Sequence, residues 1–219
     1  CHGNLLETSV DGAAPTSYLW GYASTLPVAK VDGSGYSDFA NIASKSTIIN
    51  TGEGNESNLE SILAALRAAQ GLNVTSYDYT PLVGCTKITA PNGANTTYGY
   101  QAGRLASISD HQGTQLKAFD FTMAGEGGRA RNMTSETIFK DENGSTSATA
   151  KSYYDIFGMP TINIGIENTS STIRETASAI AYDAIGRKIA ESVATPVDDA
   201  SSKSISQIIQ AAKTYYGDD

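Results

Sequence analysis

Tyr182-Asp183-Ala184-Ile185-Gly186-Arg187 is the stretch of this sequence that decides the fold. The aspartate can bond to backbone amides two residues on, and the glycine can adopt the positive φ angle that a tight turn requires. Before it, Ser178, Ile180 and Tyr182 occupy every second position, as on one face of a strand. The stretch therefore predicts a β-hairpin.

Two further segments align with this hairpin. The first copy carries Tyr98, Tyr100, Gly103 and Arg104, and the second carries Tyr154, Asp155 and Gly158. After the second copy, Ile162, Ile164 and Ile166 alternate with polar residues; after the third, Ile189 and Val193 flank Glu191 more weakly. Further turns are predicted at Pro91-Asn92-Gly93, Asp110 to Gly113 and Asp141 to Gly144, between strand-like runs such as 94–100 and 115–122. The repeats predict a mainly β fold of stacked antiparallel hairpins.

Two helices are predicted beside the strands. Ser57-Asn58-Leu59-Glu60 has the pattern of a capping box, and leucines recur at helical spacing before Gly71, which predicts a helix from Ser57 to Gln70. A second helix is expected over about 202–215, with Ile205, Ile208, Ile209 and Ala212 on one face. We expect the first helix to cover one face of the sheet.

The composition and charge of the chain argue against several classes of function. The chain has 219 residues, 40% of them hydrophobic and 17% charged, and a formal net charge of -8 without any run of Lys or Arg. A nucleic-acid or anionic-membrane binder would carry a basic patch, and no apolar stretch approaches the roughly 20 residues that cross a bilayer. We predict one continuous β unit, in which residues 1–122 carry the first hairpin and residues 123–219 carry the other two. We expect no nucleic-acid partner and no membrane span.

The repeat residues resemble a known family. Tyr182 to Arg187 matches the Tyr-Asp repeat of Rhs (YD-repeat) proteins without a departure. Two longer stretches are similar to Rhs-like proteins of Bacteroides-type bacteria: Ser17 to Tyr22 with Pro27 to Lys30, and Pro81 to Gly84 leading into Thr86 to Gly93. The resemblance implies a curved sheet of YD-type hairpins with one or two short helices packed on it, in a secreted or cell-surface bacterial protein.

Several positions depart from the family pattern. Gln101 replaces the aspartate in the first copy, which is also one residue short, and Met159-Pro160 replace Arg-Leu in the second. We expect these two copies to turn differently from the third. Larger members close their repeats into shells, which end in a self-cleavage motif that is absent here; an enclosing role is therefore not implied. The implied partner is the remainder of the parent Rhs protein.

No set of residues typical of an enzyme is found. The histidines are His2 and His111, the latter in a predicted turn, which leaves little for a metal site or a nucleophilic triad. Glu53, Glu56 and Glu60 suit a helix start rather than a glycosidase pair. We predict no catalytic residues, no metal and no cofactor, with a glycosidase-like enzyme as the weakest alternative. Cys1 and Cys85 could pair, or Cys1 could be lipidated.

Tyr18, Trp20 and Tyr22 form the candidate binding site. Their alternation predicts that the three rings share one face of a strand, where they could stack on a sugar or a protein; buried cross-strand packing explains the same pattern. The sequence thus favours a structural scaffold module. A carbohydrate- or protein-binding module is the alternative, and a homodimer through a sheet edge is a further expectation.

Overall fold

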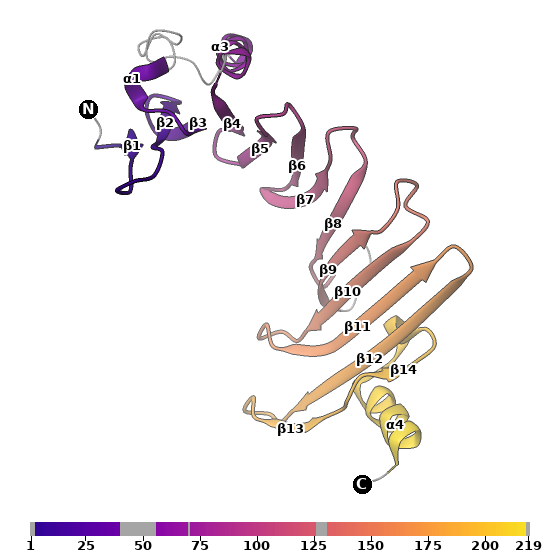
Figure 1. Cartoon of the computed structure of the whole chain (residues 1–219). Coiled ribbons are helices and arrows are strands. Elements are labelled where there is room, and N and C mark those ends of the chain that lie inside the picture. Colours follow the sequence, from indigo (N-terminus) through magenta and orange to yellow (C-terminus); the bar gives the residue numbers. More distant parts are fainter. Residues whose placement is uncertain (1–2, 40–55, 70, 126–130, 218–219) are drawn as a thin grey trace. The chain divides into compact units, whose positions relative to one another are not determined.

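The computed structural model describes residues 3–39, 56–69, 71–125 and 131–217. Across these residues the chain is mainly β: strands β1 to β13 follow one another in sheet order, and β14 pairs with β12 (Figure 1). The paired strands run antiparallel and are joined mostly by short turns. The predicted antiparallel hairpin fold is therefore confirmed.

The chain consists of two compact units. Unit 1 comprises Cys1–Arg104 with Asp110–Gly113, and unit 2 comprises Leu105–Ser109 with Thr114–Asp219. The elements of unit 1 are β1 (Glu7–Thr8), β2 (Thr16–Gly21), β3 (Leu26–Asp32), α1 (Tyr36–Phe39), α3 (Glu56–Ala68), β4 (Asn73–Thr80), β5 (Gly84–Thr89) and β6 (Asn95–Gln101). After β7 (Arg104–Ser109), unit 2 continues with β8 (Gln115–Thr122), β9 (Asn132–Phe139), β10 (Ser147–Tyr154), β11 (Pro160–Thr169), β12 (Thr172–Tyr182), β13 (Lys188–Glu191), β14 (Thr195–Pro196), the 3-10 turn η2 (Ala200–Ser202) and α4 (Ile205–Tyr216).

Helix α3 closes the core of unit 1. Its buried leucines pack against apolar residues of β2, β3 and β4, in the cluster Leu19, Val28, Ala29, Val31, Leu59, Leu63, Leu66 and Val74. The leucine spacing places all three side chains on the same helix face. The prediction that this helix covers a sheet face is confirmed. The helix begins at Glu56, one residue before Ser57, so Ser57 is not its N-cap; the preceding residue and Gln70 lie outside the described residues.

Helix α4 closes the core of unit 2. Ile208 and Ala200 join Ile162 and Ile164 of β11 and the alanines Ala177 and Ala179 of β12 in one buried cluster, with Ile205 and Ile209 packed against it. The helix starts at a capping box in which Ser204 and Gln207 bond each other's backbone amides. The predicted stripe on this helix is confirmed because its isoleucines meet the alternating residues of β11 and β12.

Candidate functional site

The turn of the third repeat is built around the Asp183 carboxylate. The amides of Ile185 and Arg187 donate to its Oδ1 at 3.0 and 2.9 Å, and Arg187 Nε donates to Oδ2 at 2.7 Å. Gly186 has φ 82°, a conformation that costs glycine little. These bonds favour the ionised carboxylate: first the Arg187 amide and then its side chain hold the pKa of Asp183 below its ordinary value.

The second repeat turns in the same way. The amides of Phe157 and Met159 donate to Asp155 Oδ1, both at 2.9 Å, and Gly158 has φ 81°. The prediction that Met159-Pro160 would change the turn is wrong. The hydrogen bond from residue 159 to Asp155 comes from the backbone amide, which a methionine supplies as well as an arginine does. Only the side-chain bond that Arg187 makes to Asp183 has no equivalent here.

The first repeat does turn differently. Strand β6 ends at Gln101 and β7 begins at Arg104, so the loop is Ala102-Gly103, with φ angles of 49° and 74°. Two residues of positive φ in a two-residue loop are the features of a type I′ hairpin turn. Without the aspartate and with one residue fewer, this copy cannot form the longer loop of the other two.

Asp110 forms a further turn of the aspartate kind. Its Oδ1 accepts the Gln112 amide at 2.9 Å and its carbonyl accepts the Gly113 amide at 3.0 Å. The sequence analysis placed a turn here but missed its likeness to Asp155 and Asp183. The signal was available, because in all three an aspartate precedes the glycine by three residues.

Tyrosine hydroxyls join successive hairpins. Three tyrosines, called here the hairpin-bridging tyrosines, donate to a backbone carbonyl of the preceding hairpin: Tyr79 to Pro27 at 2.9 Å, Tyr100 to Cys85 at 2.9 Å and Tyr182 to Pro160 at 3.1 Å. Tyr154 instead bonds the Thr134 hydroxyl of the neighbouring strand. Each contact lies within one unit, so the same device stabilises both.

The acceptor carbonyls occupy equivalent places. Pro27, Cys85 and Pro160 lie opposite Trp20, Tyr79 and Tyr154, the aromatic residues near the end of the strand before each turn. The register shifts by one residue between each of these pairs and the next pair away from the turn, as at a β-bulge. Gly84 leaves room for the contact of Tyr100, because a Cβ there would lie 2.8 Å from the tyrosine hydroxyl.

The remaining repeat residues take local roles. Tyr98 is half-buried on β6, two residues before Tyr100, and Arg104 opens β7 with an exposed side chain. Sequence reasoning identified Tyr100 and Tyr182 but missed Tyr79. Tyr79 is followed by Thr80 rather than by an aspartate, and the Tyr-Asp pair Tyr77-Asp78 lies two residues too early, so alignment with the repeat fails.

The three aromatic residues of the candidate binding strand do not share one face. The side chains of Tyr18 and Trp20 are half-buried on one face of β2, and those of Ser17 and Leu19 are buried on its other face. Tyr22 lies beyond the strand end at Gly21, with φ 51°, and packs against the core cluster of unit 1. The predicted three-ring platform is therefore wrong for Tyr22, because the chain leaves the extended conformation before it.

Tyr22 instead contacts Tyr79. The two rings meet edge to face with centroids 5.7 Å apart, and the Tyr22 hydroxyl bonds both the carbonyl and the amide of Tyr79, at 3.1 and 3.3 Å. Burial raises the pKa of Tyr79 to about 12, so at neutral pH this phenol is a hydrogen-bond donor and not a base.

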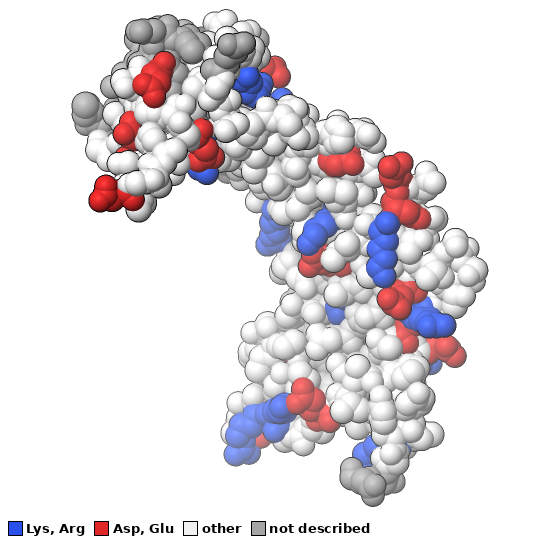
Figure 2. Space-filling view, viewed as in Figure 1, with Lys and Arg blue, Asp and Glu red and all other residues white. Residues whose placement is uncertain are grey.

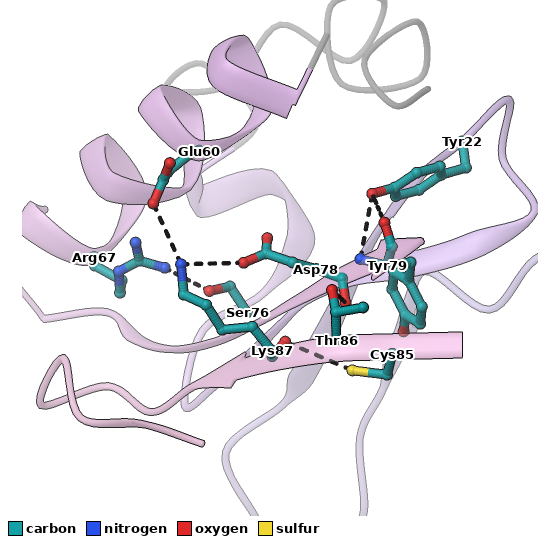
Figure 3. A network of polar contacts seen from close by, with 9 residues as sticks. All are labelled: Tyr22, Glu60, Arg67, Ser76, Asp78, Tyr79, Cys85, Thr86 and Lys87. Carbon is teal, nitrogen blue, oxygen red and sulfur yellow. Dashed lines mark hydrogen bonds and ion pairs between the residues drawn. The ribbon is translucent and has the colours of Figure 1, made fainter. Parts of the chain in front are cut away.

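A polar network ties α3 to the sheet (Figure 3). The Lys87 ammonium lies 3.3 Å from Glu60 of α3 and 3.3 Å from Asp78 of β4. Arg67 of α3 donates to the Ser76 hydroxyl. Partial burial lowers the pKa of Lys87, but the Asp78 and Glu60 carboxylates outweigh it and raise that pKa overall. A fixed cation between two carboxylates suits packing of the helix rather than proton transfer.

The structure brings no two of the described groups with catalytic potential together. His111 is exposed in its turn, and Glu60 is paired with Lys87; His2, Glu53 and the side chain of Glu56 are outside the described residues. Cys85 has a free thiol whose pKa is raised by burial, while Cys1 is not described, so their pairing stays a prediction. Within the described ranges, no group of three or more His, Cys, Asp or Glu residues could hold a metal ion.

The surface is sparsely charged. On the face drawn in Figure 2, blue and red side chains are scattered and interspersed, and most of the surface is uncharged. None of the helices in the described part of the chain is long and apolar enough to span a membrane.

Comparison with known proteins yields weak structural neighbours. No protein-family model and no curated protein sequence matches the chain. Among solved structures, a chain of the Photorhabdus luminescens Tc holotoxin pore with a mutated TccC3 aligns over 84% of this chain at 12% identity and a TM-score of 0.23. A TcdB2-TccC3 structure without its hypervariable C-terminal region aligns over 78%, at 12% identity and a TM-score of 0.25. This chain spans 11% of the length of each, and such scores assign neither fold family nor function.

Proposed function

We propose that this chain is a non-catalytic structural repeat module of a secreted or cell-surface protein of the Rhs (YD-repeat) type. The observation that carries the proposal is the recurring contact of the hairpin-bridging tyrosines, at 2.9, 2.9 and 3.1 Å from their acceptor carbonyls. A device that recurs at successive hairpins and bonds only the backbone serves the stacking of repeats. The tyrosine and aspartate of the repeat then have structural roles, and no ligand is needed to explain them.

The remaining polar side chains support the same function. Asp155 and Asp183 use their carboxylates on the amides of their own turns, which leaves them poorly placed to act on a substrate. Lys87 is held between Glu60 and Asp78. The function thus rests on the stacked hairpins within each unit, with the rest of the parent protein as the partner.

The test uses the intact parent protein. We expect the triple substitution Tyr79→Phe, Tyr100→Phe and Tyr182→Phe to increase proteolysis within this segment, since three contacts between hairpins are lost. Tyr215→Phe, at a side chain that is 62% exposed, is the matched control and should leave the cleavage rate unchanged. Equal cleavage of the triple variant and the wild type would contradict a scaffold held by these contacts.

A carbohydrate- or protein-binding surface is the second candidate. It is favoured by Tyr18 and Trp20, which are half-buried on one face of β2, with Lys30 opposite Tyr18. Trp20 Nε1 donates to the Leu5 carbonyl at 2.8 Å, so the indole is held in place. Specific binding on a glycan array that is lost in Trp20→Ala would establish this function in place of the scaffold alone. Turnover of a chromogenic glycoside would revive the enzyme alternative.

A further inference from the structure

The last hairpin of the sheet order has the same register as the hairpins that receive a tyrosine. Tyr182 lies opposite Lys188, and the register shifts between this pair and the next pair away from the turn, Ala181 with Ala190. The pairs of Trp20 with Pro27, Tyr79 with Cys85 and Tyr154 with Pro160 have the same arrangement. Lys188 therefore occupies the place of the acceptor residues Pro27, Cys85 and Pro160.

The side chain beside this acceptor is uncovered. At each register shift one residue of the second strand has no partner on the first strand. In the four hairpins this residue is Val28, Thr86, Thr161 and Ile189. Val28 is 0% exposed and Thr161 is 6% exposed, and each has a further strand beside it; Thr86 is half-buried. Ile189 is 66% exposed, and its strand β13 ends the strand order, with no described strand beyond it.

We propose that the edge of β13 is a docking site for a tyrosine-bearing β-hairpin of a partner polypeptide, whose tyrosine hydroxyl donates to the Lys188 carbonyl while its strand covers Ile189. This inference rests on the proposed scaffold function and names its partner. It continues an interface that the molecule already forms at Pro27, Cys85 and Pro160. Pairing at a sheet edge supplies affinity through the backbone, and the tyrosine supplies the register.

A second copy of this chain fits the site poorly. A donor strand must carry a tyrosine at its last or next-to-last position, as β4, β6 and β12 do. The strands at the ends of the described sheet order are β1 and β13, which contain Glu7-Thr8 and Lys188 to Glu191 and no tyrosine. Edge pairing between two copies would therefore leave the Lys188 carbonyl without its donor.

The test uses a synthetic hairpin as the probe. A fluorescein-labelled peptide of residues 172–192, which contains the Tyr182 hairpin, is titrated into the full chain and followed by fluorescence anisotropy. We expect saturable binding. The same peptide with Tyr182→Phe should bind about 3- to 10-fold more weakly, because one hydrogen bond is lost.

Two protein variants locate the site. Ile189→Lys should abolish binding, whereas Ile173→Lys should bind normally, since both isoleucines are 66% exposed and only Ile189 lies on β13. Circular dichroism checks that both variants fold. Absence of saturable binding, equal binding by Ile189→Lys, or concentration-dependent self-association of the wild type that Ile189→Lys removes would each overturn the inference. These outcomes leave the scaffold proposal standing, which fails instead if the tyrosine substitutions do not alter proteolysis.

Discussion

In both units a helix packs on a sheet of hairpins, but the residues that form the two cores differ. In unit 1 a helix with three buried leucines covers β2 to β4, and Lys87 bonds it to the sheet through Glu60. In unit 2 the helix contributes Ile208 and Ala212 as its buried residues, and its sheet supplies Ile162 and Ile164. The repeat turns differ too: a two-residue loop at Ala102 closes the first repeat, and aspartate loops close the second and third repeats, which lie in unit 2. A hairpin sheet thus tolerates different helices and turns as long as successive hairpins are joined.

The largest effect is expected from a substitution in the core of unit 1, which tests whether the two cores unfold independently. Leu63→Ala should lower the free energy of unfolding of unit 1 by about 2–5 kcal/mol, because the leucine is fully packed and only 1% exposed. Hydrogen exchange should accelerate in β3 and remain slow in β11. Leu82→Ala, at a side chain that protrudes fully into solvent, is the control. Equal acceleration in β11 would show that the units unfold together and would break the comparison.

The hairpin-bridging tyrosines should contribute unequally. Tyr100→Phe should lower the free energy of unfolding by about 0.5–1.5 kcal/mol, and Tyr182→Phe by less. The first hydroxyl lies in a partly buried contact and the second in an exposed one, so water can replace only the second readily. Urea denaturation of both variants measures the difference. A larger loss for Tyr182→Phe would reverse this order.

The turn of the first repeat carries strain that the others avoid. Ala102 has φ 49°, and a left-handed conformation costs a residue with a Cβ about 1–2 kcal/mol. Ala102→Asn should raise the free energy of unfolding by about 0.5–1 kcal/mol, because asparagine tolerates this conformation better. Thermal denaturation measures the gain. The exposed Gln112→Asn, in a turn of the aspartate kind, is the control and should not stabilise.

The smallest expected effect is the pH dependence of the aspartate turn. Because the pKa of Asp183 is lowered in the folded chain, its contribution to stability is complete above the unfolded value of about 3.9 and is lost as the pH falls through the folded pKa. Asp183→Ala should therefore be less stable than the wild type at neutral pH, and the gap should narrow below about pH 4. Urea midpoints at several pH values measure it. A gap independent of pH would show that the carboxylate charge is irrelevant.

Much of the fold follows from local signals. Alternation predicted the strand that contains Ile162 and Ile164, and leucine spacing predicted the helix that contains Leu63; both are confirmed. These signals succeed because one buried face imposes its period on the sequence. The conformation of Tyr22 could not be obtained in this way, since a residue of positive φ at a strand end interrupts the alternation without changing the sequence pattern.

The sequence by itself determined the hairpin repeats, the turns and the two amphipathic helices, because each depends on neighbouring residues. Only the tertiary structure decided which strands from different hairpins pair with each other. Tyr79 and Pro27 are far apart in the chain, and their hydrogen bond exists because β3 and β4 pair. Ile189 continues an apolar alternation like that of Ile162, yet Ile189 is exposed and Ile162 lies in the core that α4 closes. Burial of a strand residue depends on which strands and helices pack against it, and that information is not local.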